Sequence, residues 1–218
     1  MYKKDFIMTV CLKKKLLVSL IGLTSTALFA GNPSNTLPRK IGDLTGSFGV
    51  VGCLESKGGI KNLVVHTTDT APSSAIGYIW GYYSSPLAIS EESSRGSFSF
   101  IDGLDNTLKA VEYNSTESGS YATDECSALE DDGYHNWYLP SKAELQCLGQ
   151  NQEAISNTTG VSSMEGSYWS STANSEDDSK AWLVALSGSL EDYQTLPTTD
   201  SKSEVHKVRC VRAYNPAT

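Results

Sequence analysis

The residues best suited to chemistry in this chain are its histidines, cysteines and acidic clusters, and none of them stands in a catalytic motif. The sequence has no GxSxG, no phosphate-binding glycine loop and no HExxH. His66, His135 and His206 lie far apart, and no spacing pairs any of them with a nucleophile or a metal ligand. We therefore expect no catalytic, cofactor-binding or metal-binding residue, and we predict that the protein is not an enzyme.

Two acidic stretches raise the possibility of bound calcium. Residues 130–132 and 176–178 both read EDD, and carboxylate oxygens are the hard ligands that calcium prefers. Neither stretch has the alternating D-x-D-x-D-G order of a calcium-binding loop. We expect solvated acidic loops at both places.

The first thirty residues have the pattern of a secretory signal peptide. Three lysines at 13–15 precede an apolar run from 16 to 29, and small residues follow near the expected cleavage point. The run is too short for a comfortable membrane span, although an uncleaved anchor is the alternative. We predict a signal peptide over 1–30, no membrane span after its removal, and export to the periplasm, the cell surface or the medium.

Charge limits the class of partner. The chain has 17 basic and 25 acidic residues, a net charge of −8. Removal of residues 1–30 takes away five lysines and one aspartate, which leaves 12 basic and 24 acidic residues and a net charge of −12. Such a surface disfavours nucleic acid, so no nucleic-acid partner is expected.

The cysteines agree with export. Cys53, Cys126, Cys147 and Cys210 remain after residues 1–30, and an even number in an exported chain suggests two disulfides with three possible connectivities. Their spacings are too long for a zinc CxxC pattern. Free or redox-active thiols are the alternative, including a nucleophilic Cys147.

Short strands and helices must position these groups. A polar leader at 31–46 precedes one expected domain at 47–218, whose apolar and β-branched runs predict strands at 48–54, 63–67, 78–82, 97–101, 168–172, 181–186 and 205–214. Helices are predicted at 121–130 and from Ser141 to about Ile155. Long polar loops separate them, including 189–204. The mixture indicates an α+β domain.

The best-defined local signal is the junction NWYLPSKAEL at 136–145. Ser141 and Glu144 have the spacing of a capping box, and Pro140 keeps the preceding residue extended. We expect Trp137 and Leu139 to point into the core and dock the helix. We therefore predict that the junction has a structural role, docking the helix, and is not a catalytic or binding site.

Aromatic residues offer the clearest candidate for ligand binding. Tyr78, Trp80 and Tyr82 alternate and would share one strand face, next to Tyr83. With Trp169 and Trp182 they would form either part of the core or a sugar-stacking surface, and the sequence leaves both readings open. Trp80, Tyr82 and Tyr83 are the candidate ligand-binding residues.

A series of motifs resembles one known family. IDGLDNT (101–107), ATDECSAL (122–129), the junction, SYWSST (167–172), AWLVAL (181–186) and HKVRCVRAY (206–214) follow the order found in the Lcl C-terminal domain family, a bacterial domain of unknown function. The resemblance covers about residues 40–214. Asn136 and Tyr138 stand where Asp and Arg are common in the family.

The resemblance has implications for fold and cross-links. The family is similar to C-type-lectin-like domains, which implies two short helices packed on small antiparallel sheets with long loops. In such folds the cysteines of the first helix and the last strand pair. Carried onto this chain, that implies Cys126–Cys210 and leaves Cys53–Cys147 by elimination.

The resemblance also implies a function class. It suggests an exported recognition or adhesion module that binds a glycan or protein ligand through surface loops, without catalysis. The Glu-Pro-Asn or Gln-Pro-Asp and Trp-Asn-Asp triplets of sugar-binding C-type lectins are missing, so their calcium-dependent sugar site is not expected. The alternatives are an exported enzyme of the related formylglycine-generating fold, which needs a reactive thiol pair, and a structural envelope protein.

Overall fold

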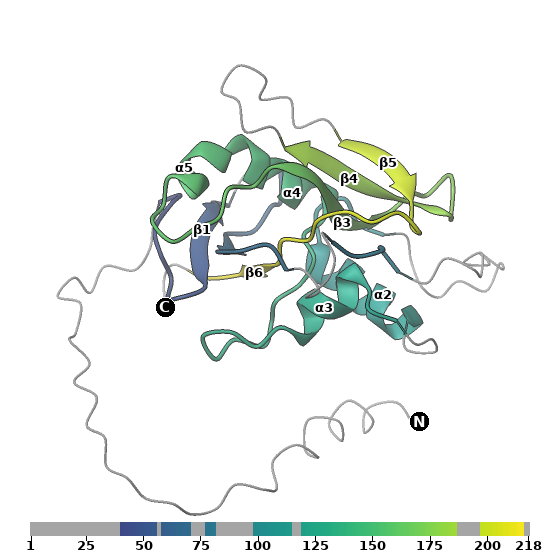
Figure 1. Cartoon of the computed structure of the whole chain (residues 1–218), viewed down its shortest axis with the longest axis horizontal. Coiled ribbons are helices and arrows are strands. Elements are labelled where there is room, and N and C mark those ends of the chain that lie inside the picture. Colours follow the sequence, from purple (N-terminus) through teal and green to yellow (C-terminus); the bar gives the residue numbers. More distant parts are fainter. Residues whose placement is uncertain are drawn as a thin grey trace, which may run out of the picture. The chain divides into compact units, whose positions relative to one another are not determined.

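Two small antiparallel sheets and a group of short helices make up the described part of the chain (Figure 1). The computed structural model describes residues 40–55, 58–70, 77–81, 98–114, 119–186 and 197–215. The predicted signal peptide lies outside these residues. No helix among them is long and apolar enough to cross a membrane. The α+β class predicted from the sequence is confirmed.

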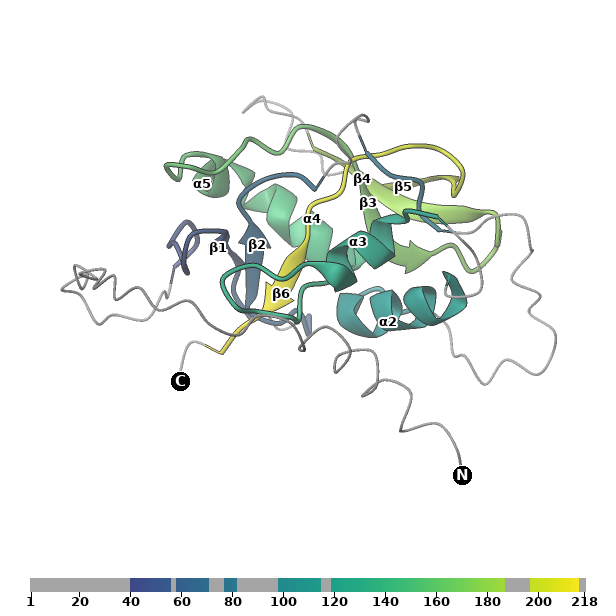
Figure 2. The ribbon, with the colours of Figure 1, turned by 60° about the horizontal axis from the view of Figure 1, so that its bottom comes forward.

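The first sheet has the order β1-β2-β6, with β1 at Gly49–Cys53, β2 at Leu63–His66 and β6 at Val211–Ala213. Figure 2 shows β2 between its two neighbours. Every residue of β1 and β2 is buried. Val64 belongs to one core cluster, and Val65 belongs to a second cluster on the opposite face. Burial on both faces explains why these strands read as continuous apolar runs.

The second sheet has the order β3-β4-β5, with β3 at Gly166–Ala173, β4 at Lys180–Leu186 and β5 at Pro197–Ser201. It too separates the two core clusters, since Trp169 and Leu183 lie in one cluster, and Tyr168 and Val184 in the other. The C-terminal segment joins the sheets: Lys207 forms a parallel bridge with Tyr168, and the chain then enters β6.

Helices cover the sheets at two places. α2 (Gly103–Asn114) packs against α3 (Ala122–Ala128), while α4 (Lys142–Gln150) contacts strands of both sheets and continues into α5 (Gln152–Ser156). Trp137 and Leu139 are buried, as the junction predicted. Asn151 separates α4 from α5, because its side-chain amide donates to the carbonyls of Cys147 and Gly52. The predicted single helix is therefore two.

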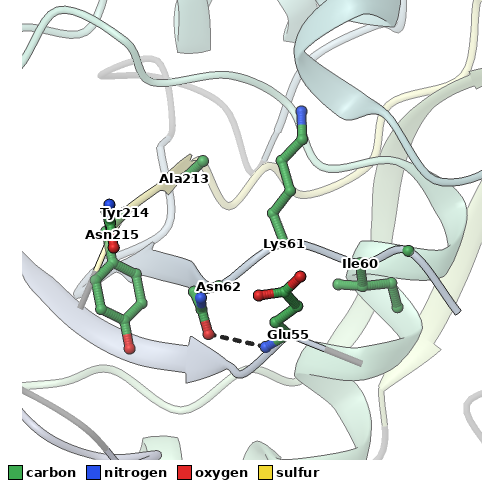
Figure 3. A pocket seen from close by; sticks show the side chains of 8 residues that line it. Glu55, Ile60, Lys61, Asn62, Ala213, Tyr214 and Asn215 are labelled. Carbon is green, nitrogen blue, oxygen red and sulfur yellow. Dashed lines mark hydrogen bonds between the residues drawn. The ribbon is translucent and has the colours of Figure 1, made fainter. Parts of the chain in front are cut away.

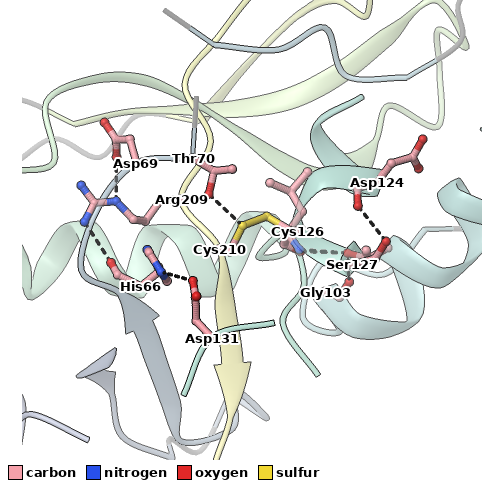
Figure 4. Close-up of a disulfide and its surroundings, with 12 residues drawn as sticks. His66, Asp69, Thr70, Gly103, Asp124, Cys126, Ser127, Asp131, Arg209 and Cys210 are labelled. Atoms are coloured by element: carbon pink, nitrogen blue, oxygen red, sulfur yellow. Dashed lines mark hydrogen bonds and ion pairs between the residues drawn. A yellow bond between two sulfur atoms is a disulfide. The ribbon is translucent and has the colours of Figure 1, made fainter. Parts of the chain in front are cut away.

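Two disulfides lie one in each core cluster. Cys126 joins Cys210, with Cα atoms 5.4 Å apart, and Cys53 joins Cys147, with Cα atoms 6.1 Å apart. The first bond ties α3 to the residue before β6 (Figure 4), and Cys53 is the last residue of β1. This is the pairing that the family resemblance implied.

Other sequence predictions of secondary structure were also wrong. Residues 78–79 form isolated bridges rather than the predicted strand, and the strand predicted at 205–214 is limited to Val211–Ala213, preceded by isolated bridges. α2 was missed because much of its buried face is polar, including Asn106, Thr107 and Asn114, and gives no apolar period. β5 was missed because a partly exposed edge strand shows no alternation. Residues 98–101 form no strand, since the hydroxyl of Ser99 accepts from the amides of Ile101 and Asp102 and turns the chain.

Candidate functional site

The motifs singled out in the sequence meet at Glu144, whose carboxylate is buried. One oxygen accepts from the amide of Ser141 at 2.7 Å and from the amide of Gly103 at 3.1 Å, and the other accepts from the hydroxyl of Tyr138 at 3.0 Å. The hydroxyl of Ser141 accepts in turn from the amide of Glu144. The predicted capping box is thus confirmed, and it also holds the first residue of α2.

Gly103 is the residue that lets the two helices meet. A Cβ atom at this position would lie 2.4 Å from a carboxylate oxygen of Glu144 and 2.6 Å from the amide nitrogen of Ser141. Such separations are shorter than any van der Waals contact, so the IDG motif requires its glycine.

Hydroxyl and amide side chains extend the network. The Thr107 hydroxyl accepts from the Leu139 amide at 3.1 Å and lies 3.2 Å from its carbonyl, while the side-chain amide of Asn106 donates to the carbonyl of Ser99 at 2.6 Å. The hydroxyl of Thr172 accepts from the amide of Lys142 at 3.1 Å. We define the motif hub as the buried group Gly103, Asn106, Thr107, Tyr138, Ser141, Glu144 and Thr172.

Burial shapes the electrostatics of the motif hub. Desolvation raises the pKa of Glu144, and hydrogen bonds from Ser141 and Tyr138 partly oppose that rise. The pKa of Tyr138 is also raised, by burial first and then by the nearby Glu144 carboxylate. With every oxygen of this pair occupied inside the protein, the motif hub acts as a scaffold.

The motif hub supports a partly exposed group of side chains at its edge. The ammonium of Lys142 lies 3.5 Å from the ring centroid of Trp182 and 4.8 Å from that of Phe100. The two rings meet edge to face, with centroids 6.5 Å apart. Phe100 is 50% exposed. We call Phe100, Lys142 and Trp182 the aromatic–lysine platform.

Three chain segments fix the aromatic–lysine platform. Lys142 begins α4 directly after the cap at Ser141, and Trp182 lies in β4. The backbone carbonyl of Phe100 accepts from the amide of Ala143 at 2.9 Å, which ties the loop before α2 to α4. The same capping box that starts α4 therefore sets the position of the lysine.

The chemistry of the aromatic–lysine platform is that of recognition. Burial lowers the pKa of Lys142, and its ammonium makes no ion pair with any described residue. A half-exposed ring beside an uncompensated cation offers an apolar face and a hydrogen-bond donor together. Ile101, the residue after Phe100 in the chain, is also exposed.

An open pocket of about 340 Å³ lies near the end of β6 (Figure 3). It is lined by Glu55, Gly59, Ile60, Lys61, Asn62, Ala213, Tyr214 and Asn215. The side-chain oxygen of Asn62 accepts from the amide of Glu55, which links two residues of the pocket lining. Lys61 also forms an ion pair with Asp102 at 3.5 Å, which links the rim of the pocket to the loop that carries Phe100.

The sequence candidates for aromatic stacking fall in different places. Trp80 is 3% exposed: its indole donates to the carbonyl of Ser170 at 2.7 Å, and the ammonium of Lys202 lies 4.7 Å from the ring centroid. Its ring is therefore part of the core. Tyr82 and Tyr83 lie outside the described residues. Trp182 is the tryptophan that reaches the aromatic–lysine platform.

The acidic clusters serve the fold. Asp131 pairs with His66 at 3.0 Å, and Asp132 accepts from the amide of Phe48 at 2.9 Å. Asp177 accepts from Ser179. Within the described ranges no group of three His, Cys, Asp or Glu side chains is placed to hold a metal ion.

The platform was only partly visible in the sequence. Trp182 was considered among the aromatics, but Phe100 and Lys142 were not, because neither belongs to an alternating aromatic pattern. The available signal was the position of Lys142 directly after the capping serine, where the side chain leaves a fixed helix start.

Comparison with known proteins gives one family. Residues 69–212, about two thirds of the chain, match the model of the family described as the Lcl C-terminal domain. β1, β2, Cys53 and every residue that lines the pocket lie outside the matched range. No curated protein matches the chain.

Proposed function

Because the chain belongs to the Lcl C-terminal domain family, we propose that it is an exported recognition module that binds a glycan through the aromatic–lysine platform. The observation behind this proposal is the ammonium of Lys142, which has no ion-pair partner among the described residues and lies against the partly exposed Phe100 and Trp182. The proposal includes a domain from residue 47 to 218 with a C-type-lectin-like arrangement, preceded by the leader at 31–46 and a cleaved signal peptide at 1–30.

Sugars match the chemistry of this surface. The C–H face of a pyranose ring is apolar and packs on an exposed aromatic ring such as Phe100. The ring hydroxyls around that face accept hydrogen bonds, and Lys142 supplies a donor at the edge of the same surface. A rigid support also lowers the entropic cost of binding, since the motif hub already fixes the platform.

The cross-links support export and argue against thiol chemistry. Two disulfides are typical of chains that fold in an oxidising compartment. An enzyme of the formylglycine-generating type needs a reactive thiol pair. Here the four cysteines form two disulfides, Cys53–Cys147 and Cys126–Cys210. Non-reducing peptide mapping with alkylation tests this point, because two alkylatable cysteines among these four would revive the enzyme hypothesis.

The binding test uses the mature chain on a glycan array, followed by calorimetry with any hit. Phe100→Ala and Lys142→Met are expected to lower affinity for the hit about tenfold or more, since each removes a direct contact. Phe48→Ala is the matched control, because Phe48 is an exposed phenylalanine away from the platform. A hit whose affinity is equal in all three variants, or an array without hits, would count against the proposal.

A protein ligand is the second candidate, favoured by the exposed apolar side chains of Ile101 and Leu108, which follow Phe100 in the chain. The two candidates separate in a cell-binding assay. Loss of binding after enzymatic removal of surface glycans supports the glycan. Loss after mild proteolysis of the cells, together with sensitivity to Leu108→Glu, supports the protein ligand.

A further inference from the structure

The two arginines of the VRCVR segment are both buried but differ in their partners. Arg209 donates to the carboxylate of Asp69 at 2.6 Å and to the carbonyls of His66 at 3.0 Å and Ser162 at 3.2 Å. Arg212 is 4% exposed. Nη2 of Arg212 donates a hydrogen bond to the hydroxyl of Thr45 at 3.3 Å. Arg212 forms no ion pair in the described part of the chain.

A second unpartnered donor lies beside Arg212. The Nε atom of Arg212 and the indole Nε1 atom of Trp137 are both buried, and neither donates to an acceptor among the described residues. The guanidinium carbon is 5.5 Å from the ring centroid of Trp137, so both donors belong to one corner of the interior. Trp137 is 2% exposed. We call this pair the Arg212 corner.

Tyr134 covers the guanidinium, and both Tyr134 and the carboxylate of Asp132 favour the charged form of Arg212, but neither accepts a hydrogen bond from Nε. The guanidinium carbon of Arg212 lies 3.6 Å from the ring centroid of Tyr134, a stacked cation–π contact. Stacking occupies the face of the guanidinium, whereas its N–H bonds point outward in the plane, so the ring leaves Nε without an acceptor. Tyr134 is itself 40% exposed, and it forms the outer cover of the Arg212 corner.

We propose that the Arg212 corner binds a small monovalent anion, either chloride or a carboxylate group, that accepts hydrogen bonds from Arg212 Nε and Trp137 Nε1. An arginine is charged at any physiological pH, and both groups are donors with no accepting atom. An anion supplies the missing acceptor for both donors, whereas the nearby carboxylate of Asp132 accepts from neither of them. Asp131 and Asp132, on the turn that carries Tyr134, disfavour a dianion such as sulfate.

This site is independent of the proposed glycan function, because it involves no platform residue. It is formed by Trp137, in the segment before α4, and by Arg212, in β6. Both residues fall within the range that matches the family.

The test measures anion binding directly by the line width of the ³⁵Cl resonance. The mature wild-type chain is expected to broaden the line. Trp137→Phe is expected to lower the affinity for chloride about tenfold or more, because it removes one of the two donors and keeps an aromatic ring in place. Acetate is then added as a competitor. Recovery of the narrow line identifies a site that also accepts carboxylates, whereas no recovery identifies a chloride site.

Thermal unfolding in sodium chloride and sodium acetate provides the second readout. The midpoint of the wild-type chain is expected to rise by about 2–4 °C relative to Trp137→Phe as either anion passes several times its Kd. Subtraction of the variant removes general salt effects. Trp169→Phe is the control, since the Trp169 indole already donates to the carbonyl of Tyr78 at 2.9 Å.

Each result decides the proposal. If Arg212→Gln does not fold, Trp137→Phe still tests the site alone. Acetate stabilisation without chloride broadening assigns the site to carboxylates. Equal line widths and equal salt dependence in the wild-type chain and Trp137→Phe would overturn the proposal and leave a neutral water as the acceptor.

Discussion

The motif hub and the Arg212 corner are both buried and polar, but they differ in how their donors are matched. In the motif hub the carboxylate of Glu144 accepts three hydrogen bonds from Gly103, Ser141 and Tyr138. In the Arg212 corner two neighbouring side chains each have a buried donor without an acceptor among the described residues. Matched polar groups fix one arrangement of the chain, whereas unmatched donors retain the capacity to bind something from solution. The following substitutions test this difference.

Glu144→Ala is expected to have the largest effect. It leaves two buried amides and the hydroxyl of Tyr138 without an acceptor, and breaking a buried network of this kind costs about 3–5 kcal/mol. Denaturant unfolding of the mature chain measures the loss. Glu176→Ala, at an exposed position, is the control and is expected to change the free energy of unfolding by less than about 0.5 kcal/mol. A small effect at Glu144 would mean that the motif hub is not a matched network.

Lysine substitution at the two arginines compares the regions directly. Arg209→Lys is expected to cost about 2–4 kcal/mol, since a lysine cannot reach Asp69 and the carbonyls of His66 and Ser162 together. Arg212→Lys keeps the charge and gives up one weak hydrogen bond and the stacking on Tyr134, so we expect a smaller cost of about 1–2 kcal/mol. Both costs are measured by denaturant unfolding without added chloride. Equal costs would show that Arg209 and Arg212 do not differ in how well their donors are matched.

Lys202 is a third buried cation, and its effect on stability depends on pH. It is 1% exposed, and burial lowers its pKa to about 8, against an ordinary value of 10.5, with Asp178 and Asp177 partly opposing the shift. Between pH 8 and 10.5 the unfolded chain binds more protons than the folded chain, so stability rises with pH in this window. The free-energy cost of burying the charged Lys202 side chain is fully present below pH 8.

Lys202→Met is therefore expected to stabilise the protein by about 1–3 kcal/mol at pH 7, because it removes a buried charge and keeps an apolar stem. The gain should shrink as the pH rises from 8 to 10.5. The free energies of unfolding of the wild-type chain and Lys202→Met are measured across this pH range and subtracted. The contributions of other titrating groups cancel in this difference. A gain that does not change with pH would show that Lys202 titrates normally.

The smallest expected effect separates two buried tryptophans. Trp169→Phe removes a hydrogen bond to the carbonyl of Tyr78, whereas Trp137→Phe removes a donor that has no acceptor among the described residues. Both lose similar ring volume, so in chloride-free buffer Trp169→Phe should cost about 1 kcal/mol more. Chemical denaturation gives the comparison. The opposite order would show that Trp137 has an acceptor after all.

Local signals in the sequence predicted local structure well. The capping box of Ser141 and Glu144 and the inward positions of Trp137 and Leu139 were all found in the structure. These features depend on residues that are neighbours along the chain, and fixed spacing is enough to recognise them.

Partners distant in the chain were not predictable in the same way. The contact between Glu144 and Gly103 spans 41 residues, and nothing in either motif alone indicates the other as its partner. The aromatic–lysine platform shares this property, because Phe100, Lys142 and Trp182 belong to three separate segments. The Arg212 corner was hidden as well, since VRCVR shows two equivalent arginines and only the fold supplies Asp69 to one of them.

The two disulfides have a consequence for how this domain responds to mechanical force. Under a pull applied outside Cys53 and Cys210, tension passes from Cys53 to Cys147, back along the chain to Cys126, and across to Cys210. The backbone between the bridges that can extend is then the 126–147 segment, at most about 70–75 Å at full stretch. The 157 residue steps from Cys53 to Cys210 would otherwise lengthen the chain by about seven times as much. Breaking the bonds would therefore convert a short, stiff tether into a long, compliant one.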